Sequence, residues 1–172
     1  TYTSGLDGVV AGYILLDPKA GWSYLLETMK DHGKDFPVKY ASLKTVRFFW
    51  EFRPDVIAPA ESLGAIQLLL SDPDIADMPM EDLRKWKQWD LTPVVLGYAN
   101  KESHNGTPII MRAILKFAIA ASWADPKNTA AIEYVKAARV KDPKRVQFLE
   151  EVLKDEQKPT PPPSPEKKDA PK

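Results

Sequence analysis

The chain has 172 residues, of which 44% are hydrophobic and 28% are charged, and its formal net charge is +0. These values are typical of a soluble globular protein, and without an excess of basic residues we expect no binding of nucleic acid. The absence of cysteine excludes disulfides, thiolate zinc sites, iron–sulfur clusters and thiol catalysis.

Proline repeatedly precedes runs of apolar residues with helical spacing. At the first position of a helix proline costs no hydrogen bond, and a preceding Asp or Thr caps the free amides. No alternation of apolar and polar residues indicates a strand. We therefore predict an all-α fold, with helices starting at Asp17-Pro18, Phe36-Pro37, Asp72-Pro73, Thr107-Pro108, Asp125-Pro126 and Asp142-Pro143.

The pattern predicts about nine helices joined by short turns. Pro79 is expected to split the fifth helix, Asp90 to cap the sixth, and residues 100–106 to form a polar loop. The most apolar helix, 109–121, is the predicted buried centre. In chain order the predicted ranges are 4–16, 18–30, 37–52, 59–70, 74–86, 91–98, 109–121, 126–140 and 143–154.

Neighbouring helices pair into units that begin near Ser4, Pro37, Asp74 and Thr107, at a spacing typical of helical repeats. We expect residues 1–156 to form one domain, a right-handed stack of antiparallel helix pairs of the HEAT-like α-solenoid type. An irregular helical bundle is the alternative.

The composition changes at the C-terminal tail, residues 157–172, where proline and lysine dominate. Such a segment cannot bury enough apolar surface to fold, so we predict that the tail is disordered. It is interpreted as a spacer or as a ligand for a groove that binds polyproline II helices.

Four stretches can be compared with known families: 8–17 with Gly21, 83–90, 108–118 and 139–151. They resemble an uncharacterised family of bacterial HEAT-like helical-repeat proteins. The resemblance implies a helical-repeat fold and export from the cytoplasm, and it implies no activity. Met111 stands where the family's pattern has a second basic residue, which argues against an anion site there.

Two groups of residues are candidates for partner binding. Trp86 and Trp89, beside Arg84, are three residues apart, so we expect both rings on one helix face. They either anchor a partner, because Trp and Arg dominate binding hot spots, or seal the gap between helix pairs. Arg112 and Lys116, four apart on the most apolar helix, either join this surface, reach water, or pair with an acid on a neighbouring helix.

No reactive site is predicted. His32 and His104 are interpreted as surface residues, and their separation does not suit a shared metal ion. Acidic residues gather within 72–82 and would suit a small all-α enzyme that uses clustered carboxylates, although helix caps and solvated turns also explain them. We expect no cofactor, no metal and no catalytic activity.

The leading hypothesis is a non-catalytic protein–protein interaction or scaffold module, which binds its partner in a groove between helix pairs near Trp86, Trp89 and Arg112. The rival is a structural or accessory subunit of a larger, extracytoplasmic complex. No apolar run reaches the roughly 20 residues that span a bilayer, so no transmembrane segment is expected. The chain begins at Thr1, which predicts a processed or truncated N-terminus and leaves periplasm and cytoplasm open.

Overall fold

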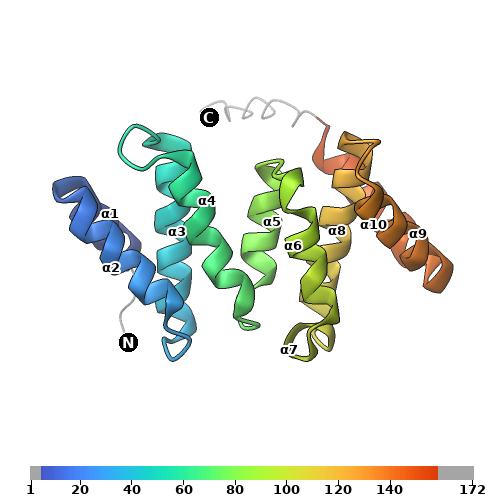
Figure 1. Ribbon diagram of the computed structural model, residues 1–172, viewed down its shortest axis with the longest axis horizontal. Coiled ribbons are helices and arrows are strands. Elements are labelled where there is room, and N and C mark those ends of the chain that lie inside the picture. The colour runs from blue at the N-terminus through green and yellow to red at the C-terminus, as the bar shows by residue number, and fades with distance from the viewer. Residues whose placement is uncertain (1–4, 159–172) are drawn as a thin grey trace, which may run out of the picture.

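A computed structural model describes residues 5–158, which form ten α-helices, three short 3-10 helices and no strand. Figure 1 shows the helices following one another from one end of the molecule to the other. This confirms the predicted all-α class. The helices are α1 (Leu6–Leu16), α2 (Pro18–Lys30), α3 (Phe36–Phe52), α4 (Pro59–Leu68), α5 (Asp77–Lys85), α6 (Thr92–Gly97), α7 (Glu102–Asn105), α8 (Pro108–Ala124), α9 (Thr129–Lys141) and α10 (Pro143–Glu156).

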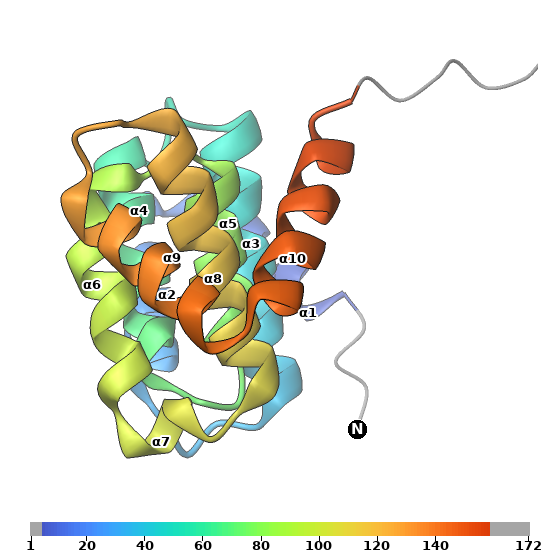
Figure 2. The same ribbon diagram turned by 90° about the vertical axis from the view of Figure 1, so that its right-hand side faces the viewer.

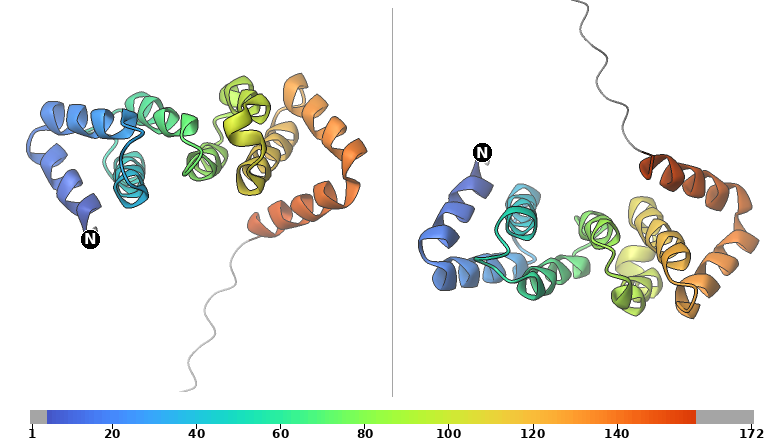
Figure 3. Two further views of the ribbon diagram at one scale, coloured as in Figure 1. Left: turned by 90° about the horizontal axis from the view of Figure 1, so that it is seen from below. Right: turned by 90° about the horizontal axis from the view of Figure 1, so that it is seen from above.

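The longer helices lie in two layers. Figure 3 shows α1, α3, α5, α8 and α10 in one layer and α2, α4, α6 and α9 in the other. Consecutive helices from opposite layers pack together, as in the pairs α1 with α2, α3 with α4, and α9 with α10. Because α1 and α10 both project to the same side (Figure 2), the first layer lines the inner surface of a shallow curve.

One apolar core runs through most of the array. Buried side chains of α1 to α5 and α8 form a continuous cluster, in which Phe49 and Phe117 are the largest fully buried residues. A second cluster joins α8 to α9 and α10 and contains Ile119, Leu149 and Leu153. Since α8 contributes to both clusters, the prediction that 109–121 forms the buried centre is confirmed.

Four of the six proline positions begin helices as predicted. Pro18, Pro108 and Pro143 are first residues of α2, α8 and α10, and Pro37 is the second residue of α3. The Asp17 carboxylate accepts a hydrogen bond from an amide of the first turn of α2 at 3.1 Å. This is the capping geometry that the Asp-Pro pattern predicts.

Pro73 and Pro126 do not begin helices. Both lie in turns, and the following helices start later along the chain, at Asp77 for α5 and Thr129 for α9. Asn128 caps α9 by accepting a hydrogen bond from the Ala131 amide at 3.1 Å. The Asn side chain therefore sets this helix start in place of the Asp-Pro pair.

Three other local predictions are wrong. Pro79 does not split α5 but lies in its first turn, where amides lack intrahelical partners. Asp90 lies inside the 3-10 helix Trp89–Leu91 and does not cap α6. The predicted loop at 100–106 contains α7.

Some predictions concern residues outside the described range. These are the helix start at Ser4, since α1 begins at Leu6, and the disorder of the tail beyond residue 158. Among the helices of residues 5–158, none combines the length and the apolar character needed to cross a membrane.

Candidate functional site

The two tryptophans predicted to share a helix face contact different helices. α5 ends just before Trp86, and Lys87 has a φ of 57°, so the backbone turns between the two rings. Trp86 stacks on Trp50 of α3, with ring centroids 4.2 Å apart and ring planes inclined by 16°. Trp89 meets the edge of Phe117 of α8, with centroids 5.4 Å apart. The prediction of a shared helix face is wrong.

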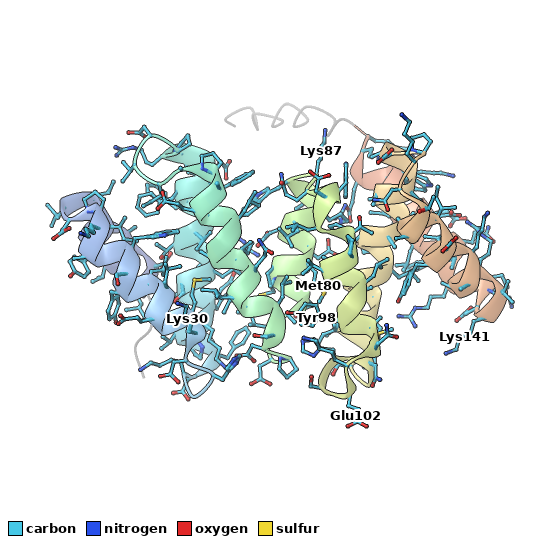
Figure 4. The ribbon with its side chains drawn as sticks, in the orientation of Figure 1. Lys30, Met80, Lys87, Tyr98, Glu102 and Lys141 are labelled. Atoms are coloured by element: carbon cyan, nitrogen blue, oxygen red, sulfur yellow. The ribbon has the colours of Figure 1, made fainter. Side chains whose placement is uncertain are left out.

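The contacts of both tryptophans are structural. Each ring is half-buried and packs against the main apolar core. Figure 4 shows Lys87 projecting outward from the turn between them. The geometry favours the second interpretation of the pair, in which the rings seal the gaps between helices.

An open groove lies along α8 on the inner layer. Ile109, Arg112, Lys116 and Trp123 are spaced by three, four and seven residues, which places them on one side of the helix. The hollows along this stripe are also lined by residues of α5 and of the end of α10. We call this surface the α8 groove and define it by Asp77, Glu81, Arg84, Lys85, Ile109, Arg112, Lys116, Trp123 and Glu156.

Four charged side chains form a closed ring in the middle of the α8 groove. Lys116 Nζ lies 2.9 Å from Glu81 Oε1 and 3.0 Å from Glu156 Oε1. Arg84 Nη2 lies 2.8 Å from Glu81 Oε2 and 2.7 Å from Glu156 Oε2. Each cation therefore contacts both carboxylates, and this charge ring links α5, α8 and the last turn of α10.

The charge ring is partly removed from water. The side chains of Arg84 and Lys116 are 9% and 10% exposed, whereas that of Glu156 is 38% exposed. Burial acts to raise the pKa of Glu156, but the hydrogen bonds and charges of Lys116 and Arg84 outweigh it and hold that pKa below its ordinary value. The interpretation that Lys116 pairs with an acid on a neighbouring helix is confirmed.

Large apolar side chains are exposed on both sides of the charge ring. Ile109 is 58% exposed beyond one side and Trp123 is 39% exposed beyond the other. Arg112 makes no ion pair within residues 5–158, and its Cζ lies 6.0 Å from the ring centroid of Phe148 on α10. The α8 groove thus combines a guanidinium that has no ion-pair partner among residues 5–158 with exposed aromatic and aliphatic surface.

The acidic residues of 72–82 do not converge. Asp72 forms a buried ion pair with Lys39 of α3, and Asp82 lies with its Oδ2 2.7 Å from Nε of Arg47. Glu81 belongs to the charge ring. These carboxylates face three different sets of neighbours, so the geometry gives no support to catalysis by a carboxylate cluster.

The two histidines have different surroundings. The prediction of a surface residue is confirmed for His32, whose side chain is 59% exposed. It is wrong for His104, which is 1% exposed and whose Nε2 lies 2.8 Å from the carbonyl oxygen of Leu70. Because a carbonyl oxygen only accepts, Nε2 carries the hydrogen of this contact, and Nδ1 lies 2.8 Å from the hydroxyl of Ser103.

Sequence reasoning missed Ile109, Trp123 and Glu156 as parts of the α8 groove. The spacing of Ile109 and Trp123 relative to Arg112 and Lys116 was an available signal, since all four share one helix face. Glu156 gave no such signal, because it meets Arg84 from 72 residues away.

In the part of the chain that the structure describes, no three His, Asp or Glu side chains are placed to hold a metal ion. Comparisons with protein-family models, with curated proteins and with solved structures find no match to this chain. The geometry of the α8 groove is therefore the basis for a functional proposal.

Proposed function

We propose that this chain is a non-catalytic interaction module whose helix pairs stack as a right-handed, HEAT-like α-solenoid, and that its α8 groove binds a segment of a protein partner. The two-layer order of the helices supports the solenoid, because each helix pair contacts mainly its neighbours along the chain. Solenoids of this type use extended concave surfaces for binding, and the α8 groove lies on the inner layer.

The observation that carries the proposal is the exposure of Ile109 and Trp123 on the stripe that also presents Arg112. Tryptophan and arginine are enriched among residues that dominate binding energies. Lys85 adds a second cation with no ion pair within residues 5–158. A segment with apolar anchors and an acidic residue near Arg112 fits this surface.

Site-specific photo-crosslinking tests the proposal. A photoreactive phenylalanine analogue is placed at Ile109 or Trp123 in the groove, and at Val140 of α9, which is 88% exposed on the other layer. In extracts of the source cell we expect one common protein adduct from both groove positions and none from Val140. Adding Arg112→Glu to the Trp123 probe should abolish that adduct.

Two outcomes would contradict the proposal. One is the same set of adducts at the groove positions and at Val140, which would indicate unspecific contact. The other is an adduct that forms only at Val140, which would place the partner on α9 and not in the groove.

A further inference from the structure

A second hollow, of about 310 Å³, lies between α8, α9 and the start of α10. It faces a side of α8 adjacent to the α8 groove and shares no residue with it. The apolar part of its lining includes Met111 and Leu115 of α8 and Ala138 of α9. The volume is at the lower end of the range of about 300–1,000 Å³ that small-molecule sites occupy.

The rim of this hollow carries more positive than negative charge. Lys141 and Arg145 both line it, and neither forms an ion pair within residues 5–158. Figure 4 shows Lys141 at the C-terminal end of α9, from which the chain continues through Asp142 into α10. The one carboxylate of the rim, Asp142, already accepts a hydrogen bond from the Arg145 amide at 3.0 Å as the cap of α10. Two cations are thus available to an anion from solution.

Tyr134 brings a hydroxyl donor to the same hollow. Burial raises the pKa of its phenol, and the nearby Arg145 guanidinium acts against that rise. Within residues 5–158 the Tyr134 hydroxyl makes no hydrogen bond, so it is available as a donor to a ligand.

We propose that this hollow binds a small free carboxylate with a hydrocarbon body, of the kind represented by a medium-chain fatty acid. The hydrocarbon body packs on Met111 and Leu115. The carboxylate accepts a hydrogen bond from Tyr134 and is held by Arg145 and Lys141, because charge-assisted hydrogen bonds to carboxylate are the stronger ones. This site is independent of the protein-binding proposal for the α8 groove.

The probe is octanoate, observed in solution through the methyl groups of the chain's four methionines, labelled with carbon-13. We expect a saturable shift of the Met111 methyl and no shift of Met29 or Met80, which are buried elsewhere in the core. Octylammonium and 1-octanol have the same hydrocarbon chain without the negative charge. Each should bind at least about tenfold more weakly, the size of one lost charge-assisted hydrogen bond.

Matched variants separate this site from unspecific binding. Arg145→Gln and Lys141→Gln should each weaken the binding of octanoate by about tenfold and leave the binding of 1-octanol unchanged. Lys144→Gln, also exposed on α10 but outside the lining, should change neither. Ala138→Phe should fill the hollow and abolish binding, with circular dichroism used to confirm that this variant is folded.

Three results would overturn the proposal. They are equal binding of octanoate and octylammonium, unchanged octanoate affinity in both Gln variants, and the absence of a Met111 shift up to the solubility limit of octanoate. None of these results affects the crosslinking expected at the α8 groove, so each proposal can be refuted without refuting the other.

Discussion

The indole rings of Trp50 and Trp86 stack with their centroids 4.2 Å apart and join α3 to the end of α5. The ion pair of Arg47 with Asp82 connects the same two helices. These contacts fasten the first four helices to the rest of the array. They explain why a tryptophan beside several basic residues in the sequence belongs to the framework of the protein.

Trp86→Ala should lower the free energy of unfolding by about 3 kcal/mol, because it removes a half-buried ring and the stacking contact of that ring with Trp50. Trp50→Ala should have a similar effect. In the double variant the loss of stability should be about 1 kcal/mol smaller than the sum of the two single losses. This difference is the size of an aromatic pair interaction. Urea denaturation measures all three values.

Trp123→Ala is the matched control for this prediction. Its ring is 39% exposed, so the cost should stay below about 1 kcal/mol. Equal losses for Trp86→Ala and Trp123→Ala would contradict the structural role of Trp86.

Glu156→Gln should reduce stability at neutral pH and have little effect in acid. The pKa of Glu156 is lower in the folded protein than its ordinary value of 4.5, so its contribution to stability is present above that value. It is lost as the pH falls through the lowered pKa. Since the Glu156 side chain is 38% exposed, solvent screening limits the contribution to about 1 kcal/mol.

Urea denaturation at pH 7 and pH 3 checks this prediction. Glu151→Gln, at an exposed position of α10 outside the charge ring, should change stability by less than about 0.5 kcal/mol at either pH. If Glu156→Gln lowers stability more at pH 3 than at pH 7, the predicted direction of the pH dependence is wrong.

Asp72→Asn and Asp82→Asn should differ, although each removes a buried carboxylate paired with a cation. Asp72→Asn leaves Lys39 buried without its partner, which should cost about 3 kcal/mol at pH 7. Asp82→Asn should cost less than about 1 kcal/mol, because Arg47 is 34% exposed and retains contact with water.

The pKa directions of these two carboxyls are opposite. Burial acts to raise the pKa of Asp72, but Lys39 and the Asp74 amide outweigh it and hold the pKa low. For Asp82 burial prevails over Arg47 and the pKa is raised. The stability contributed by Asp72 is therefore lost as the pH falls through its lowered pKa, whereas that of Asp82 is lost as the pH rises through its raised pKa.

Stability measured from pH 3 to pH 8 separates the two cases. The difference between wild type and Asp72→Asn should shrink in acid, and the difference between wild type and Asp82→Asn should shrink toward neutral pH. Parallel pH profiles for the two variants would contradict this assignment.

The helices were predictable where local chemistry alone decides them. The apolar residues of α8 leave water only if the helix is buried between other helices, so its central position was predictable. Asp17 and Asp142 cap the helices that begin with the prolines after them. The helix start predicted at Asp125-Pro126 was wrong because Asn128, two residues after the proline, caps the helix instead. The sequence therefore indicates more than one possible start for this helix, and the Asn128 cap is the one that forms.

The site was predictable only in part. The left-handed conformation of Lys87 separates Trp86 from Trp89, and a lysine gives no local signal for it because glycine or asparagine is the usual choice there. His104 is buried, and its Nε2 donates to the carbonyl oxygen of Leu70, 34 residues earlier. The charge ring likewise depends on a contact across 72 residues. Such pairings follow from the packing of helices and have no expression in sequence spacing.

Gly21→Ala and Gly64→Ala should shift stability in opposite directions, although both replace a glycine inside a helix. A Cβ at Gly21 would lie 2.7 Å from Cα and 2.8 Å from N of Ile14, so α1 would have to move away from α2. Overpacking of this kind costs about 1–3 kcal/mol, which exceeds the gain of about 1 kcal/mol in helix propensity. At Gly64 the Cβ meets nothing within 4 Å, so only that gain remains. Thermal melts should show a lower Tm for Gly21→Ala and a higher one for Gly64→Ala; a rise for both would mean that α1 and α2 are not held in close contact.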